Sequence, residues 1–310
     1  MLRAFTPLDF LAVEAMISAF SEQTPEVDGL YHAVFAAPER LQLWTGPDGP
    51  RGFVFAPGRD VRVLTGFYAN EPEERLAMLE AAIASLLDSD ALAVMAPERF
   101  GDVTLGSDLQ RHGFQRIERI DMVQEIARVP EAPVDVPEPF RLIDWDASRD
   151  PEAAALLSAS NQGTIDGLFL CFPDLPEPEA CLARLEAIRG GQFGAFLPEV
   201  SAMVLEGDRL VGLLLATLGA PGEVFLYELA LSREVQRRGL APMLIRRLQE
   251  TSRVRGHTGI RFMWCDRNRA VRKLFPPETI ISETRDPWWI WRSEAYRLLR
   301  PKRGSVPIGG

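Results

Sequence analysis

A proline-rich segment near the middle of the chain does most to limit how this sequence can fold. Pro130, Pro133, Pro137 and Pro139 lie within ten residues. Proline has a fixed φ and no backbone N–H, so such a segment cannot form the interior of a helix or of a central strand. We therefore predict a domain at 1–128, an extended linker at 129–139, a second domain at 140–300 and a flexible tail at 301–310.

The two parts of the chain begin and end with similar patterns. Each opens with a short apolar strand and a capping residue followed by proline, at Thr6 and at Asp150. Each closes with a strand-like segment, at 113–125 and at 279–291. These parallels favour an internal duplication of one α+β unit, although strand-then-helix openings also arise by chance.

Hydrophobic periodicity predicts the elements between these ends. Helices are expected at 72–87, 178–189, 239–253 and 269–275, and strands at 200–205, 210–218, 223–231 and 259–264. The hairpin followed by strand, helix, strand and helix indicates an α+β fold, with a mixed and mostly antiparallel sheet flanked by helices.

Composition excludes several functional classes. The formal net charge is −10, and residues 1–130 carry 11 Arg and no Lys against 20 acidic residues. This balance disfavours general nucleic-acid binding. Three cysteines without a CxxC pair, and only three histidines, argue against a disulfide framework and a metal site. The N-terminus is a poor secretory signal and no apolar run is long enough to span a bilayer, so we expect a cytoplasmic protein without membrane contact.

One segment of the second part carries the pattern of an anion site. An apolar strand at 223–231 leads through a short turn into Gln236-x-x-Gly239-x-Ala241, which opens a helix. First-turn amides of a helix have no internal partner and lie at its positive end. Glycine and a small alanine would let a phosphate approach the backbone. The alternative is an ordinary tight turn between strand and helix.

This segment resembles the acyl-CoA motif of the GNAT superfamily of N-acyltransferases, [Gln/Arg]-x-x-Gly-x-[Gly/Ala]. The resemblance implies two tandem GNAT-like domains and acetyl-CoA as the acyl donor, without a metal. It assigns the pantetheine arm and thioester to Leu229, Ala230 and Leu231, and the pyrophosphate to Gln236, Arg237, Arg238, Gly239, Leu240, Ala241 and Pro242. Pro242 has no N–H, so its contact would be packing alone. The two arginines could equally be solvated residues at a helix start.

A second element of the family follows the next strand. The superfamily pattern Asn-x-x-Ala-x-x-Leu-Tyr is similar to Asn268-Arg-Ala-Val-Arg-Lys-Leu274-Phe275, and this assigns Asn268 and Phe275 to the cofactor site. The family's tyrosine usually protonates the departing CoA thiolate. Phenylalanine has no proton to give, which leaves the general acid open.

The first part retains other traces of the family. Residues 108–114 resemble the closing Leu-Tyr-x-x-x-Gly-Phe element, with Leu109 in the tyrosine position. The stretch at 65–75 has no Gly-x-Gly/Ala turn and carries Glu71, Glu73 and Glu74 where phosphates would bind. Like charges repel, so we predict a degenerate copy without cofactor.

Transfer to an amine requires a base that removes its proton. Glu228, beside the thioester strand, is the first candidate, and Asp266, at the end of the following strand, is the second. Glu228 could instead point to solvent or pair with an arginine, and Asp266 could simply end its strand.

The sequence thus predicts an acetyl-CoA-dependent N-acetyltransferase that acts on the primary amine of a small molecule. An alternative within the class is a mycothiol-synthase-like enzyme. A non-catalytic acyl-CoA sensor is the rival from another class, and the missing tyrosine is its best support. The sequence leaves a homo-oligomer open.

Overall fold

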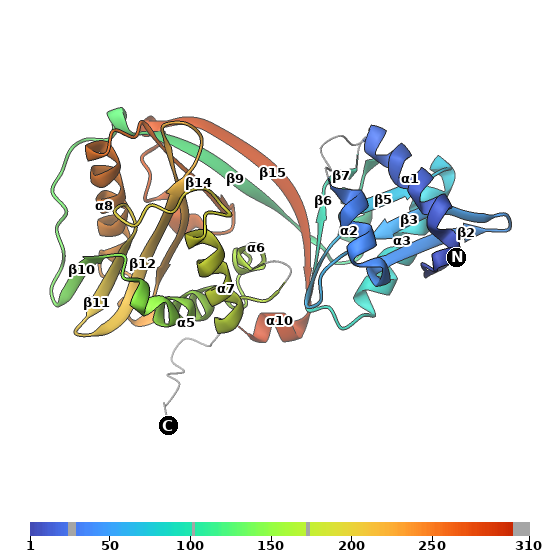
Figure 1. The fold of residues 1–310 in the computed structure, drawn as a ribbon, viewed down its shortest axis with the longest axis horizontal. Coiled ribbons are helices and arrows are strands. Elements are labelled where there is room, and N and C mark those ends of the chain that lie inside the picture. Colours follow the sequence, from blue (N-terminus) through green and yellow to red (C-terminus); the bar gives the residue numbers. More distant parts are fainter. Residues whose placement is uncertain (24–28, 101–102, 172–173, 300–310) are drawn as a thin grey trace, which may run out of the picture. The chain divides into compact units, whose positions relative to one another are not determined.

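The computed structural model describes residues 1–23, 29–100, 103–171 and 174–299, so the predicted flexible tail at 301–310 lies outside the described residues. The chain forms two compact units (Figure 1). Unit 1 consists chiefly of residues 1–117 and 287–299, and unit 2 chiefly of residues 118–171 and 175–286.

The sheet of unit 2 has the strand order β10-β11-β12-β13-β14-β9-β15. In chain order these strands are β9 (Gln115–Glu125), β10 (Phe140–Asp144), β11 (Ala202–Glu206), β12 (Arg209–Leu218), β13 (Glu223–Leu231), β14 (Gly259–Cys265) and β15 (Ile280–Arg292). β13 and β14 pair in parallel, whereas β10–β11, β11–β12, β12–β13 and β14–β9 pair antiparallel. This mixed, mostly antiparallel sheet confirms the predicted fold class.

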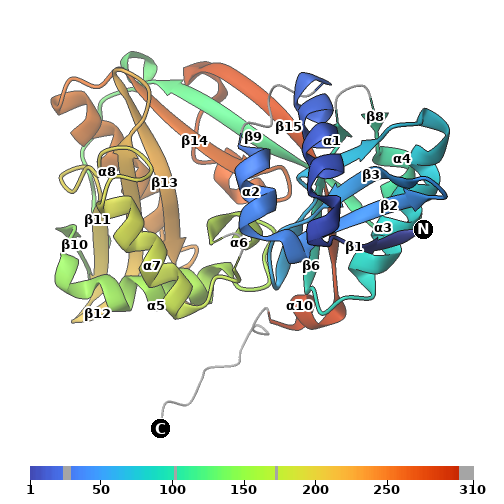
Figure 2. The same ribbon diagram turned by 45° about the vertical axis from the view of Figure 1, so that its right-hand side comes forward.

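Helices cover both faces of this sheet (Figure 2). α5 (Asp150–Asn161) and α7 (Pro178–Arg189) pack on one face with Leu213 and Leu215 of β12. α8 (Leu240–Val254) packs on the other face with Leu214 and Ala216 of the same strand. The alternation of β12 therefore supplies two separate cores. Two short helices, α6 (Gly167–Leu170) and α9 (Arg269–Arg272), complete unit 2.

Unit 1 repeats the same order of elements. Its strands are β1 (Leu2–Ala4), β2 (Leu41–Gly46), β3 (Gly49–Phe55), β4 (Val61–Val63), β5 (Gly66–Ala69), β6 (Ala93–Pro97), β7 (Arg99–Phe100) and β8 (Val103–Thr104), and its helices are α1 (Phe10–Gln23), α2 (Leu30–Ala36), α3 (Arg75–Leu87), α4 (Gly106–Arg111) and the C-terminal α10 (Glu294–Leu298). The hairpins β2–β3 and β11–β12, the helices α3 and α8, and the strands β6 and β14 correspond in order. This correspondence supports the duplication inferred from the sequence.

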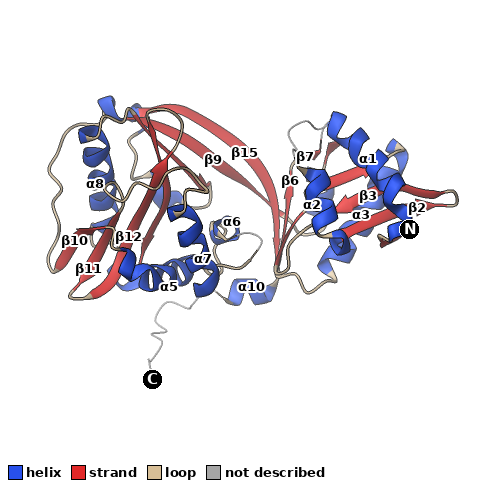
Figure 3. Ribbon diagram, viewed as in Figure 1, coloured by secondary structure: helices blue, strands red, loops and turns tan. Residues whose placement is uncertain are grey.

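The closing strand of each copy pairs with the sheet of the other. β9 follows the elements of unit 1, yet it pairs with β14, with Arg119 opposite Cys265. β15 follows the elements of unit 2, yet its last residues pair with β6, with Trp289 opposite Ala96. Figure 3 shows both as long strands that belong partly to each unit.

The observed division of the chain therefore differs from the predicted domains. The first unit ends before residue 128, and it also takes residues 287–299 from the predicted second domain. Burial explains this assignment, because the Trp289 side chain is buried in the core of unit 1, where Gly106 leaves room for its indole. A strand pattern in a sequence does not say which sheet will accept the strand.

The proline-rich segment at 129–139 does not connect the two units, since it lies within unit 2. It is held against α8 by polar contacts from that helix. Arg253 donates to the carbonyl of Val129 at 2.6 Å, and Arg246 donates to the carbonyl of Pro130 at 2.6 Å. The segment is irregular, as its prolines predict, but it is docked on the fold.

A buried chain of hydrogen bonds connects α8, β9 and the start of β15. The amide of Gln249 donates to Oε1 of Gln124 at 2.9 Å, and Nε2 of Gln124 donates to the Thr279 hydroxyl at 2.8 Å. Thr279 in turn donates to the carbonyl of Pro276 at 2.7 Å. The exposed fractions of Gln124, Thr279 and Gln249 are 0%, 0% and 3%. Because water does not reach them, these three side chains depend on one another for their hydrogen bonds.

We expect Gln124→Leu to destabilise the protein by about 1–3 kcal/mol, because it leaves the buried groups of Gln249 and Thr279 unsatisfied. Urea denaturation of the variant measures this loss. The matched control is Gln110→Leu, which removes an exposed glutamine from α4 and should change stability by less than about 0.5 kcal/mol. Equal losses in the two variants would show that the buried chain contributes nothing of its own.

Candidate functional site

The site begins where two parallel strands separate. β13 pairs with β14 only over Glu223–Leu226, whereas it pairs with β12 along its whole length. Tyr227 is an extra residue in the β12–β13 register, since Leu226 and Glu228 face consecutive residues of β12. Such a bulge bends its strand and increases the local twist. Beyond Tyr227, β13 therefore has no strand partner on the side of β14.

The three residues predicted to hold the thioester end of the donor lie in this diverging part of β13. Leu229 faces the α8 core, Ala230 faces the α5–α7 core, and Leu231 packs at the edge of the α8 core. The carbonyl of Leu231 accepts from the side chain of Gln236 at 3.4 Å. Gln236 thus ties the strand end to the turn that follows.

The turn before α8 has two residues in the left-handed conformation. Arg237 has φ 65° and Gly239 has φ 84°. No atom lies within 4 Å of a Cβ built on Gly239, so the space in front of the turn is open. A run of amides in such a turn forms a concave anion-binding nest, and the first-turn amides of α8 extend it. Leu240 and Ala241 open that helix, and Pro242 follows as an exposed residue without an N–H.

The two arginines of the turn differ in their surroundings. Arg238 pairs with Glu206 at 3.3 Å and lies over the ring of Phe140, 4.6 Å from its centroid. Arg237 is exposed and forms no ion pair within the described part of the chain. Arg237 is therefore the arginine free to meet an incoming phosphate, whereas Arg238 would first have to leave its partners.

Glu228 lies on the opposite face of the sheet from α8, beside Leu215 of β12. Burial, followed by the negative charge of Asp166, raises the pKa of its carboxyl to about 7. Hydrogen bonds from the Leu229 backbone and from the Asn161 side chain act in the opposite direction. A carboxyl with this pKa can exchange a proton at neutral pH, which is what a general base requires.

Asp166 is a second carboxylate at this site, and sequence reasoning missed it. Its Oδ1 accepts from the backbone N–H of Cys265 at 3.1 Å, and its Oδ2 accepts from the side-chain amide of Asn268 at 2.9 Å. Asn268, predicted to contact the cofactor, is therefore engaged with Asp166. The sequence offered one signal for Asp166, which is the mostly polar segment from Asn161 to Asp166 directly after a helical pattern.

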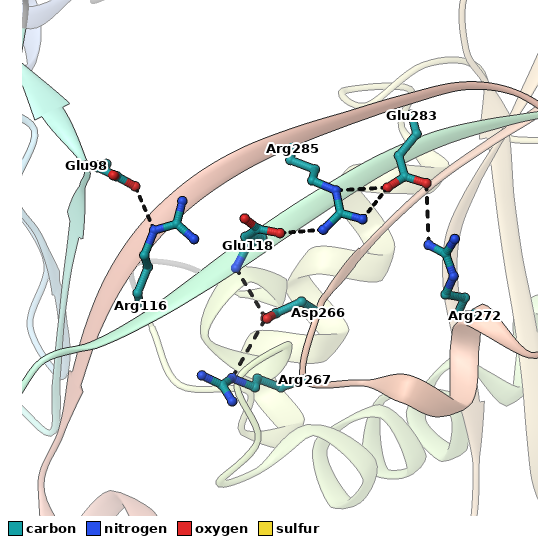
Figure 4. Close-up of polar contacts among 8 residues, drawn as sticks. All are labelled: Glu98, Arg116, Glu118, Asp266, Arg267, Arg272, Glu283 and Arg285. Atoms are coloured by element: carbon teal, nitrogen blue, oxygen red, sulfur yellow. Dashed lines mark hydrogen bonds and ion pairs between the residues drawn. The ribbon is translucent and has the colours of Figure 1, made fainter. Parts of the chain in front are cut away.

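Asp266 contacts Glu118 of β9 (Figure 4). Its Oδ1 accepts from the N–H of Glu118 at 3.2 Å, and its own N–H donates to the Glu118 carbonyl at 2.9 Å. The carboxylate of Glu118 pairs instead with Arg285 of β15 at 2.6 Å, and the carboxylate of Asp266 pairs with Arg267 at 3.9 Å. These contacts favour the alternative interpretation, in which Asp266 simply ends its strand.

Phe275 lies in the hydrophobic core on the α8 side. Only 3% of its surface is exposed, and its ring stacks on that of Phe262 with the centroids 3.7 Å apart. The structure therefore shows a packing role for Phe275, and contact with a cofactor stays a prediction.

Tyr227, the bulged residue of β13, lies at the point where β13 and β14 separate. Its ring contacts Phe193 at 5.5 Å between centroids, and burial raises the pKa of its hydroxyl. It retains its proton at neutral pH and could donate it.

The corresponding turn of unit 1 is acidic. Residues Pro72–Glu74 form a short 3-10 helix directly before α3. The carboxylate of Glu74 accepts from the indole N–H of Trp44 at 2.8 Å and pairs with Arg51 at 3.2 Å. The N-cap residue of α3 is therefore a glutamate, whose side chain is held by Trp44 and Arg51 and caps no amide of the helix.

Among the described residues, no group of three or more His, Cys, Asp or Glu side chains could hold a metal ion. No helix in the same residues has the length and apolarity to cross a bilayer.

Comparison with known proteins agrees with this geometry. Residues 178–276 match the acetyltransferase (GNAT) family. A GCN5-related N-acetyltransferase from Sphaerobacter thermophilus aligns over 94% of this chain and 95% of its own, with a TM-score of 0.51 and 18% identity. A probable N-acyltransferase from Enterococcus faecalis V583 aligns over 94% and 72%, with a TM-score of 0.56 and 12% identity. A GCN5-related N-acetyltransferase from Kribbella flavida aligns over 95% and 71%, with a TM-score of 0.53 and 13% identity. At these identities the likeness shows the fold, and no curated protein matches the chain.

The raised pKa of Glu228 predicts how stability depends on pH. The folded state binds this proton more tightly than the unfolded state, so the free energy of unfolding falls as pH rises from about 4.5 to about 7. Glu228→Gln removes the buried charge and should be more stable than the parent protein by roughly 1–3 kcal/mol at pH 8.5. Its advantage should shrink toward pH 4.5. Denaturant unfolding at both pH values measures this, and Glu186→Gln on the exposed face of α7 is the control. A pH-independent difference would show that folding does not raise the pKa of Glu228.

Proposed function

We propose that the protein transfers an acetyl group from acetyl-CoA to the primary amine of a small molecule, because residues 178–276 match the acetyltransferase (GNAT) family. One observation carries the proposal. A parallel strand pair that separates at Tyr227 lies directly before an open, left-handed turn at the start of α8. A splayed strand exposes backbone groups to a pantetheine arm, and the turn offers amides to a pyrophosphate.

Each step of the transfer can be assigned to residues of unit 2. The amides from Arg237 to Ala241 would bind the pyrophosphate, and the backbone of Leu229 to Leu231 would align the thioester. Backbone N–H groups there would stabilise the oxyanion that forms when the amine attacks the carbonyl. Glu228 would take the proton of the amine, directly or through a water.

Collapse of the tetrahedral intermediate releases CoA. Phe275 cannot protonate the sulfur, but a thiol with a pKa of ~8.5 is already a tolerable leaving group near neutral pH. The thiolate can therefore leave without an acid, or take its proton from Tyr227 at the point where the strands separate.

We further propose that unit 1 is a copy that binds no CoA. Its helix start carries Glu74, whose carboxylate is already bound by Trp44 and Arg51. A phosphate at this position would meet the negative charges of Glu71, Glu73 and Glu74. The chain should therefore bind one CoA.

A second candidate is an acyl-CoA sensor without catalysis. The specific observation that favours it is the burial of Phe275 in the core, where the family has an acidic hydroxyl. The two candidates share the CoA site and differ in the role of Glu228.

The CoA site is tested by a pair of glycine substitutions at the two ends of α8. Gly239 and Gly256 have φ 84° and 78°, and neither has an atom within 4 Å of a built Cβ. Gly239→Glu should weaken CoA binding at least tenfold, about 1.4 kcal/mol, because it adds bulk and negative charge at the turn. Gly256→Glu, with the same backbone strain, should leave affinity unchanged. Calorimetry measures both affinity and stoichiometry. Two equivalent sites in the parent protein, or equal losses in the two variants, would contradict the assignment.

Catalysis is tested by Glu228→Gln with acetyl-CoA and a panel of amines. Loss of the general base should reduce turnover by about 10²–10⁴-fold while CoA affinity is retained. Release of CoA thiol measures the rate. A parent protein that binds CoA but acetylates no amine would favour the sensor, and full activity in Glu228→Gln would exclude Glu228 as the base.

A further inference from the structure

A closed turn connects α5 with α6 at the acceptor side of the site. The amide and the hydroxyl of Thr164 both donate to the carbonyl of Asn161, at 3.1 and 2.7 Å. The N–H of Gly167 donates to the same hydroxyl at 2.9 Å. A Cβ on Gly167 would lie 2.1 Å from the Asn161 carbonyl oxygen, so only glycine allows this approach. The turn thus holds its two ends, Asn161 and Asp166, in a defined relation.

The two ends of the turn reach the two strands that separate. Next to Asn161, the hydroxyl of Ser160 donates to the carbonyl of Leu231 on β13 at 3.5 Å, and the Asn161 side chain acts on the pKa of Glu228 on the same strand. The carboxylate of Asp166 is bound at the end of β14 by the N–H of Cys265 and by the amide of Asn268. Both oxygens of Asp166 are therefore fixed by neutral donors. Its negative charge is not cancelled by either donor.

Several elements place groups near Glu228. Asp166 comes from the turn, Asn161 from α5, Cys181 from α7, and Tyr227 from β13 itself. Arg184 of α7 acts on Tyr227 and on Cys181. Among the described residues, Asp166 is the one charged group that contributes to the raised pKa of Glu228. No cation among them acts on this pKa.

We propose that Asp166 is a positioning residue, which acts through its fixed negative charge to make Glu228 a stronger base toward the acceptor amine. The inference rests on the proposed acetyl transfer with Glu228 as its base. The physical reason is that a like charge in a poorly solvated site disfavours the ionised form of its neighbour. A glutamate with an ordinary pKa would be too weak a base for an ammonium group, and proton transfer is most efficient when the pKa of the base is near the working pH.

The decisive experiment compares pH profiles of kcat/KM for the parent protein and for Asp166→Asn, with acetyl-CoA and the best amine of the panel. The variant keeps the shape of the side chain and removes its charge. Its acid limb should move to lower pH by at least about half a pH unit. Asp144→Asn, which removes a carboxylate paired with Arg247 at the surface, is the matched control and should leave the acid limb in place.

A second measurement does not depend on turnover. The gain in stability of Glu228→Gln over its parent starts near the unfolded-state pKa, and the pH at which this gain levels off reports the proton affinity of Glu228 in the folded protein. In the Asp166→Asn background this pH should be lower, by the same shift as the kinetic limb. Asp166→Glu, which restores a charge at greater length, should move both readouts back toward the parent protein.

The outcomes separate this inference from the proposed function. If Glu228→Gln abolishes turnover but Asp166→Asn leaves both pH readouts unchanged, the role of Asp166 is refuted and the base stands. If Glu228→Gln retains full activity, the proposed base fails, and the stability measurement still decides whether Asp166 and Glu228 are coupled.

Discussion

The separation of β13 from β14 is the constraint on which the rest of the site depends. Up to Leu226 the two strands share hydrogen bonds, and from the bulge at Tyr227 onward β13 pairs with β12 alone. Unpaired backbone groups are costly unless something binds them. The divergence therefore creates both an opening in the sheet and a set of groups that a ligand can satisfy, directly before the left-handed turn at Gly239.

The opening has two chemically different sides. On the α8 side the turn offers backbone amides and one unpaired arginine, which suits an anion. On the side of α5 and α7 the strand presents Glu228, and the turn of α5–α6 adds the carboxylate of Asp166. A polyphosphate and an amine are thus expected to approach the same strand from opposite faces, so that their reacting ends meet at the separation.

The exchange of closing strands makes each copy depend on the other. β9 lies beside β14 and contributes Gln124 to the buried chain that connects α8 with Thr279. The copy with the acidic helix start thus supplies a strand to the sheet that carries the candidate site. If unit 1 binds no CoA, as proposed, its last strand still has a structural task in the second sheet, which accounts for the retention of its fold.

The sequence by itself determined the local elements and the turn motif. Residues 178–189 and 223–231 form the predicted helix and strand, because their periodicity and flanking residues act over a few positions. The glycine turn was equally visible, since φ above zero has a strong residue preference. The tertiary structure alone decided which sheet β9 and β15 would join, and it brought Asp166 to Asn268 and Glu228 across more than sixty residues of chain. Such pairings depend on which distant partners can bury surface and satisfy polar groups, and no local pattern in the sequence specifies them.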